Sequence, residues 1–436
     1  MGGKEDGITA GKTGWRFLLG VVVALGALLA ASSARAGGLF LYEVGTSDVG
    51  YAAAGNAARA EEPSTLLFNP AGMTRLPGTQ VQGGLQGLYG HFEFSPNQET
   101  TATGSNGGNA IGFLPNGSAF VTHAVSEDFR VGLGIYSNFG LAEKWEDDWV
   151  GRYYTQQSAL LGISFTPAVA YRLVDGLSIG GGLNVMYGYL KQVAAVNNAP
   201  FPTQDGKLEV ADSAWGVGGN VGLLYEFTKD SRVGVTYTSP VKLNFSATPK
   251  FSNVNPLLTG VLKLTGLYQT RLDLGMTVPQ TVMASFVLGL SDRWALLGDV
   301  GWQNWASFGR VEVNVATSNP VNLTTNIGYK DTWHVALGAQ YQITPPLRLT
   351  FGVAYDSSMT NAGNRTLSLA VGDAWRFGIG AKYALGQNLD LGVAYELLWG
   401  GSPGVNVNRG PLAGQVAGNY NNTRIQFLAV NATWKF

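Results

Sequence analysis

If this chain were an enzyme, histidine would have to act in most of the catalytic chemistry, because the chain contains no cysteine. Its three histidines, His91, His123 and His334, lie far apart. None of them has the spacing of a metal-binding pair, and none accompanies a nucleophile-elbow motif. The absence of cysteine also excludes disulfides and thiolate metal sites. No nucleotide-binding motif is present. We therefore expect a protein that is not an enzyme and needs no cofactor.

Binding of an anionic group is a second kind of chemistry, and it requires a cation that faces an interior. Lys330 has the parity of the inward face of a predicted strand, whereas Lys191 and Arg271 lie at strand ends near an outer rim. The alternative is that each cation pairs with a nearby carboxylate such as Asp331 or Asp273. Only 13% of the residues are charged and the net charge is -1, so no basic surface for nucleic acid is expected.

The elements that must position these side chains are strands. The chain has 61 glycines and is rich in aromatic residues, with 18 Tyr, 20 Phe and 11 Trp. Its longest apolar stretch, residues 17–31, is shorter than the roughly 20 residues that a spanning helix needs. A glycine-rich, aromatic-rich chain of low charge without spanning helices is typical of a transmembrane β-barrel.

Apolar and polar residues alternate along most of the chain after residue 78. Between Trp375 and Leu385 the odd positions are apolar and, except for Ala381, large, while the even positions include Arg376, two glycines and Lys382. One face is aliphatic in its middle and aromatic toward its ends, which suits a lipid-facing band. The other face mixes small residues with isolated charges, which leaves room inside. The last strand alternates up to the terminal Phe436.

Fourteen strands are predicted, joined alternately by short turns and long loops, as in outer-membrane barrels. The even number places both barrel termini on the periplasmic side. Fourteen strands enclose a lumen too wide for wall side chains alone to fill. The predicted strands are 78–94, 117–126, 129–139, 157–173, 176–193, 207–228, 231–250, 268–290, 293–313, 325–344, 347–358, 370–385, 388–401 and 421–436.

Two segments precede the barrel, which is predicted over residues 78–436. Residues 1–36 have positive charges, an apolar stretch and an Ala-Arg-Ala cleavage signal, and they predict a secretory signal peptide. Residues 37–77, called the hatch below, do not alternate like strands and are predicted to fold back into the lumen. Within the hatch, Asn69-Pro70-Ala71-Gly72 has the residues of a type I turn. This motif is either a simple turn or a rigid contact between the hatch and the wall.

Several motifs in this order resemble the FadL family of outer-membrane long-chain fatty acid transporters, which includes importers of toluene-like hydrocarbons. The resemblance covers residues 37–436. The motifs are Gly38-Leu39-Phe40-Leu41-Tyr42-Glu43, Asn69-Pro70-Ala71, Tyr329-Lys330-Asp331 with Ala336-Leu337-Gly338, Tyr355-Asp356-Ser357-Ser358 and Asn364-Arg365. Met359 and Ala374 depart from the family pattern at loops that face outward, which puts the substrate in doubt more than the architecture.

The resemblance implies a fourteen-stranded barrel with an N-terminal hatch in its lumen. It also implies a kink in the third strand that opens the wall sideways, which we place at Asn138, Phe139 and Gly140. The Asn-Pro-Ala turn of the hatch should then pack against this kink. Lys330 matches a lysine of the family, which makes it the first candidate to bind a fatty acid carboxylate.

An apolar loop completes the expected route of a hydrophobic substrate. Loop 251–267 carries Leu257, Leu258, Val261, Leu262 and Leu264, which approximate a helical stripe. We expect this loop to capture substrate together with Phe201 in loop 194–206, although the two loops could instead only pack on each other. Passive uptake of long-chain fatty acids or related hydrophobic molecules, with lateral release, is the predicted function.

Two other functions stay open at this point. Uptake of toluene-type aromatic hydrocarbons is the first alternative, and a general porin is the weaker one. A purely structural or adhesion barrel would leave the hatch without a purpose. The expected partners are hydrophobic small molecules, outer-membrane lipid and lipopolysaccharide, and the expected state is a monomer.

Overall fold

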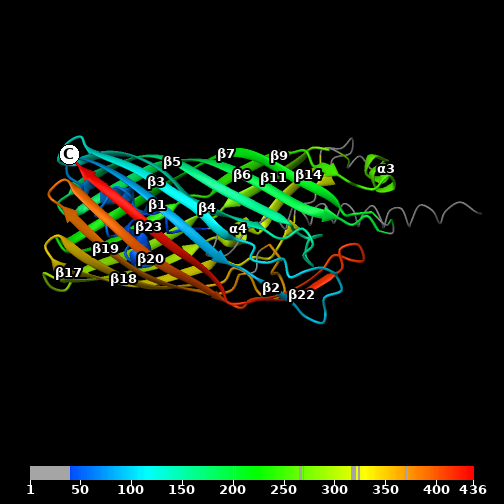
Figure 1. Cartoon of the computed structure of the whole chain (residues 1–436). Coiled ribbons are helices and arrows are strands. Elements are labelled where there is room, and N and C mark those ends of the chain that lie inside the picture. Colours follow the sequence, from blue (N-terminus) through cyan, green and yellow to red (C-terminus); the bar gives the residue numbers. More distant parts are fainter. Residues whose placement is uncertain are drawn as a thin grey trace, which may run out of the picture.

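The fold is a closed antiparallel barrel of fourteen strands, seen in a computed structural model (Figure 1). The structure describes residues 40–436 except 200, 202, 265–267, 269, 316–320, 323–324 and 369–370. The predicted signal peptide, residues 1–36, lies outside the described residues. No helix in the described part of the chain is long and apolar enough to cross a membrane.

The barrel strands follow the predicted order, but four of them, β8, β12, β13 and β17, are much shorter than predicted. The first strand pairs with the last, from Gln80 opposite Lys435 to His91 opposite Arg424, and β7 pairs with β8, which closes the ring. The barrel strands are β1 (Thr79–His91), β3 (Gly112–Ala124), β4 (Phe129–Lys144), β5 (Gln157–Val174), β6 (Leu177–Val196), β7 (Gly206–Thr228), β8 (Ser231–Thr238), β12 (Thr281–Gly289), β13 (Trp294–Gln303), β17 (Thr332–Thr344), β18 (Leu347–Asp356), β19 (Ala374–Leu385), β20 (Leu389–Gly401) and β23 (Thr423–Lys435).

The two faces of these strands follow the parity read from the sequence. On β19, Trp375, Ile379 and Tyr383 point outward and are about half exposed, whereas Arg376 points inward and is fully buried. On β23, Leu428, Val430 and Trp434 are likewise exposed, and the residues before each of them are buried. Aromatic residues gather toward both ends of the outer face, as expected of a barrel in a bilayer.

Three of the predicted strands are interrupted at a similar height, which the alternation did not show. Pro240 separates β8 from β9 (Val241–Ala247), and Pro279 separates β11 (Leu272–Val278) from β12. A short helix, α4 (Trp305–Phe308), separates β13 from β14 (Arg310–Val315). Because proline has no N–H to donate to a neighbouring strand, it ends regular pairing at the first two breaks.

Beyond these breaks, β9, β11 and β14 pair in a separate small sheet, which also includes β15 (Val321–Asn322) and β16 (Thr325–Asn326). The inward-facing Gly216 and Gly188 of the barrel wall lie directly against Val241 and Leu243 of β9, so β9 packs inside the wall formed by β6 and β7. The remaining elements are β2 (Phe94–Pro96), β10 (Lys250–Ser252), α3 (Pro256–Leu264), β21 (Gly404–Asn408) and β22 (Gln415–Tyr420).

The described part of the hatch lies inside the barrel, in the half that carries the short turns and the C-terminus (Figure 1). It contains η1 (Ser47–Tyr51), α2 (Thr65–Phe68) and η2 (Pro70–Arg75), and most of its side chains are buried. By the usual orientation of outer-membrane barrels, this short-turn end faces the periplasm.

Candidate substrate pocket and wall gap

Main-chain groups of the hatch are held by side chains from the wall. Gly55 N–H donates to Asp299 Oδ1 at 3.0 Å, and Ala57 N–H donates to Ser285 Oγ at 2.9 Å. On the periplasmic side, Arg232 donates to the carbonyl of Ala58 at 2.7 Å. These bonds satisfy the irregular backbone of the hatch, which would otherwise be buried without partners.

The Asn-Pro-Ala turn is rigid, but it does not touch the kink of β4, so this expectation was wrong. The Asn69 side chain accepts from Ala71 N–H at 3.1 Å and donates to Leu223 O of β7 at 2.9 Å. Gly180 and Gly222 let the turn approach β6 and β7, because a Cβ at Gly222 would lie 2.0 Å from Asn69 Oδ1. The turn therefore rests on β6 to β8, and the helix η2 that it opens also packs on β5, away from the bend.

The third barrel strand, β4, bends where the resemblance placed a kink. Its pairing with β3 ends at Tyr136, and its register with β5 shifts between Tyr136 and Phe139, where β4 has one extra residue. Gly140 has φ +135, and a Cβ there would lie 2.2 Å from Leu160 O, so the position requires glycine. From the bend toward the long-loop end of the barrel, β3 and β4 are no longer paired, which leaves a gap in the hydrogen-bond ladder of the wall.

The beginning of the described chain, rather than the Asn-Pro-Ala turn, meets this bend. Leu41 N–H donates to Asn138 O at 2.8 Å, and Phe40 forms a bridge with Phe139. On its other side, Phe139 packs on the rings of Trp305 and Phe308 from α4, with ring centroids 6.5 and 6.0 Å apart. The bend is thus connected both to the hatch and to the interrupted strand across the lumen.

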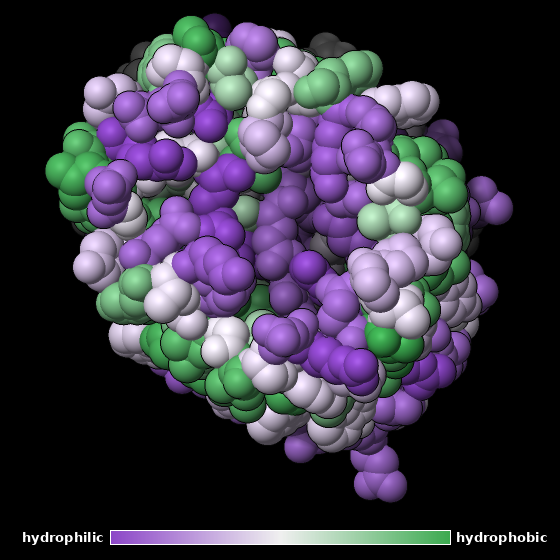
Figure 2. All heavy atoms as spheres, turned by 90° about the vertical axis from the view of Figure 1, so that its left-hand side faces the viewer, coloured by the Kyte–Doolittle hydropathy of each residue, from purple (hydrophilic) through white to green (hydrophobic). Residues whose placement is uncertain are grey.

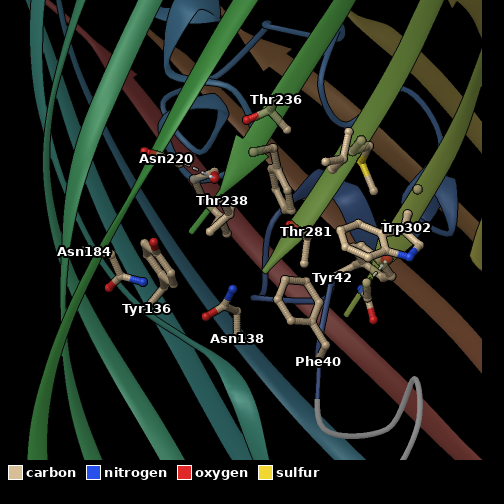
Figure 3. A pocket seen from close by; sticks show the side chains of 16 residues that line it. Phe40, Tyr42, Tyr136, Asn138, Asn184, Asn220, Thr236, Thr238, Thr281 and Trp302 are labelled. Atoms are coloured by element: carbon tan, nitrogen blue, oxygen red, sulfur yellow. Dashed lines mark hydrogen bonds between the residues drawn. The ribbon is translucent and has the colours of Figure 1, made fainter. Parts of the chain in front are cut away.

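An uncharged cavity lies between the bend and the interrupted strands (Figure 3). Its volume is ≈ 50 Å³, and none of the side chains that line it is charged. Both the hatch and the wall contribute apolar groups, and most hydroxyl and amide groups come from the wall. The lining residues are Phe40, Tyr42, Leu67, Phe68, Tyr136, Asn138, Asn184, Asn220, Thr236, Thr238, Thr281, Val282, Met283, Gly301, Trp302 and Gln303.

A buried charge cluster ties the hatch to the wall beside this cavity. Arg376 contacts Glu43 of the hatch, Asp356 Oδ2 at 2.6 Å and Glu396 Oε1 at 3.1 Å, and it is fully buried. His334 Nδ1 lies 2.7 Å from Asp356 Oδ1. Sequence reasoning did not single out this cluster. Its signal was present, because Asp356, Arg376 and Glu396 all have inward parity on successive strands.

The periplasmic end of the lumen is a polar vestibule of ≈ 870 Å³, visible as a hydrophilic hollow in Figure 2. Glu61 of the hatch accepts from Arg348 at 2.6 Å and lies 3.5 Å from Arg232. Burial alone would raise the pKa of Glu61, but the charges of Arg348 and Arg232 outweigh burial and hold this pKa well below its usual range. This ionised carboxylate anchors the hatch at its periplasmic end.

The apolar loop forms helix α3 at the opposite end of the molecule (Figure 1). Leu257 and Leu264 are 67% and 90% exposed, whereas Leu262 is buried; Leu258 and Val261 are half-buried. Phe201 is also exposed. The two predicted capture loops do contact each other, because Asn198 donates to Asn253 O at 2.8 Å, yet this contact leaves the leucines uncovered.

The three predicted cations do not line the cavity. Lys330 is exposed and precedes β17: the strand starts at Thr332, after the lysine, so the strand parity that assigned Lys330 to the inner face does not apply there. Lys191 lies 3.8 Å from Glu209, and Arg271 lies 2.9 Å from Asp273. The alternative that such cations pair with carboxylates therefore holds for Lys191 and Arg271.

The outward apolar band, the closed ring and the hatch define an outer-membrane β-barrel. Comparison with known proteins agrees: residues 27–436 match the family model described as outer membrane protein transport protein (OMPP1/FadL/TodX). The chain belongs to this family, whose members are outer-membrane channels for hydrophobic substrates and not enzymes.

Relatives include outer membrane protein P1 of Haemophilus influenzae, which is 28% identical over 77% of this chain and 80% of its own length. The long-chain fatty acid transport protein of Escherichia coli K12 is 26% identical over 77% and 82%. Among solved structures, a Pseudomonas aeruginosa FadL homologue has TM-score 0.82 at 19% identity over 91% of this chain and 100% of its own. The Ralstonia pickettii toluene transporter TbuX has TM-score 0.65 at 18% identity over 91% and 99%.

Proposed function

We propose that this chain takes up long-chain fatty acids or related hydrophobic molecules by passive diffusion and releases them sideways through the gap between β3 and β4. The observation that carries the proposal is the position of the gap. Tyr136 and Asn138 lie at the bend of β4 and also line the cavity, so a ligand in the cavity is next to the separated strands.

The entrance and the far end of the lumen support the same route. Exposed Leu257 and Leu264 offer apolar surface at the loop end, and each buried CH₂ of a ligand gains about 0.8 kcal/mol relative to water. At the periplasmic end, Arg232, Arg348 and Glu61 hold the hatch in a strongly polar vestibule. An apolar molecule therefore finds a less costly exit toward the bilayer than through the periplasmic mouth.

The test uses cells that lack their own transporter of this family and express this chain. Deleting Ser137, which does not line the cavity, removes the extra residue of β4 and should restore a regular pairing with β5, whereas deleting Gly363 in an exposed loop is the matched control. We expect the first deletion to abolish oleate uptake and the second to leave it unchanged. Normal uptake after a deletion that straightens β4 would contradict lateral release.

Uptake of aromatic hydrocarbons is the second candidate, and the uncharged cavity favours it. No lining side chain offers a positive charge to a carboxylate. A general porin is disfavoured because the hatch occupies the lumen; a large, steady ionic current through single purified channels would restore that candidate.

A further inference from the structure

Three side-chain amide oxygens around the cavity lack hydrogen-bond partners within the described residues. The Oδ1 atoms of Asn138, Asn184 and Asn220 are buried and make no hydrogen bond within the described residues. They come from three wall strands, β4, β6 and β7, and in Figure 3 they lie along the left and lower side of the lining. Since buried polar atoms in folded proteins nearly always have a partner, each such oxygen requires an explanation.

The other polar groups of the lining are mostly occupied. Tyr136 OH lies 2.8 Å from Thr166 Oγ1, and Gln303 Nε2 donates to Tyr42 OH at 2.9 Å. Asn220 uses its Nδ2 on Leu67 O of the hatch at 3.1 Å. Asn138 and Asn184 differ from these residues, because neither amide makes a hydrogen bond within the described chain and both residues are only 8% exposed.

We infer that the cavity binds an apolar molecule through an uncharged hydroxyl head group, with the amides of Asn138 and Asn184 as its hydrogen-bond partners. This inference rests on the proposed function and names the ligand class. An amide offers both an acceptor and two donors, which matches the O–H of an alcohol, a phenol or a protonated carboxylic acid. An ionised carboxylate is disfavoured, because the lining holds no cation to offset its desolvation.

The size of the cavity sets a condition on binding. At ≈ 50 Å³ it is smaller than the roughly 150 Å³ that accommodate a benzene ring. Side chains of the lining must therefore repack to admit a ring, and water can serve the amides in the ligand-free protein. The hatch residues of the lining are held to the wall less regularly than the strands, so we expect them to move.

The experiment measures binding of 4-methylphenol, toluene and 4-methylbenzoate at pH 8 to the full mature chain in detergent by equilibrium titration. Toluene and 4-methylphenol differ by one hydroxyl, so the ratio of their affinities reports the head-group contacts. Asn184→Leu removes one amide at nearly constant volume. Asn431→Leu is the matched control, because Asn431 is also 8% exposed and faces inward but does not line this cavity.

We expect the wild type to prefer 4-methylphenol to toluene and to bind 4-methylbenzoate poorly. Asn184→Leu should lower the preference for 4-methylphenol about five- to tenfold, the usual value of one hydrogen bond, while Asn431→Leu leaves it unchanged. Asn138→Leu replaces Asn184→Leu if the latter does not show the heat-modifiable mobility of a folded barrel.

An equal affinity of the wild type for 4-methylphenol and toluene would overturn the inference, as would an unchanged ratio in Asn184→Leu. Uptake of oleate and toluene by cells that express the wild type is measured in parallel. If both are transported, such a result removes the head-group assignment alone. If neither is transported, the proposed function itself fails.

Discussion

Replacing Arg376 by methionine should release the hatch from the barrel wall. Arg376 is fully buried and holds three carboxylates, those of Glu43, Asp356 and Glu396. Without it, these acids and His334 remain buried and have lost their guanidinium partner. Breaking a buried ion pair by removing one partner costs about 3–5 kcal/mol. We expect Arg376→Met to lower the free energy of unfolding by this amount.

The assay is equilibrium unfolding in urea of the barrel refolded into liposomes, with ion conductance across planar bilayers as a second readout. Because Glu43 belongs to the hatch and the other members belong to the wall, loss of the arginine should also raise conductance. Arg271→Met is the control: its pair with Asp273 is exposed, and exposed pairs contribute about 0–1 kcal/mol. A loss for Arg376→Met no larger than that of the control would refute the reasoning.

Three further predictions concern the exposed leucines of α3, the hatch carboxylate Glu61 and Lys330. Leu257→Ser with Leu264→Ser should reduce oleate uptake but change stability by less than about 0.5 kcal/mol, since both side chains are exposed; urea unfolding and uptake assays separate the two effects. Glu61→Gln should destabilise the protein at pH 7, and the difference from wild type should persist at pH 5 and shrink only in stronger acid. The reason is that the pKa of Glu61 is lower in the folded protein than in the unfolded chain. Its carboxylate therefore stabilises the fold at pH values above the unfolded pKa, and this contribution is lost as the pH falls through the folded pKa. Unfolding measured at several pH values tests this prediction. Lys330→Ala should leave oleate uptake unchanged, because Lys330 is exposed and outside the cavity, and a clear loss of uptake would return the lysine to the binding site.

The barrel could be predicted because its cause is periodic. An outward side chain at every second residue needs only the local sequence to be recognised, and Trp375, Ile379 and Tyr383 lie on the outer face for this reason. The bend of β4 was placed correctly by resemblance to a family. The lining of the cavity could not be predicted, because Asn184, Thr281 and Tyr42 meet only through the register of distant strands and the path of the hatch.

The alternation of side chains could not assign a face to residues that lie outside the strand. Lys330 was assigned to the inner face because the strand was expected to begin at residue 325, but β17 begins at Thr332. The Asn-Pro-Ala turn was misplaced for a different reason. A turn motif fixes local geometry, whereas the part of the wall that it touches depends on glycines far away in the sequence, here Gly180 and Gly222.

The breaks at Pro240, Pro279 and α4 divide this side of the wall into two parts: the periplasmic part contains β8, β12 and β13, and the outer part contains β9, β11 and β14. The ring is closed in the periplasmic part by the pairing of β7 with β8, β8 with β12 and β12 with β13. None of these ladders includes residues of α3 or β9. Apart from β10, which pairs with the start of β7, segment 241–278 can therefore be exchanged or lengthened without altering these ladders. We expect a chimaera that carries the corresponding segment of a relative to insert as a barrel still, but to differ from this chain in its preference among hydrophobic substrates.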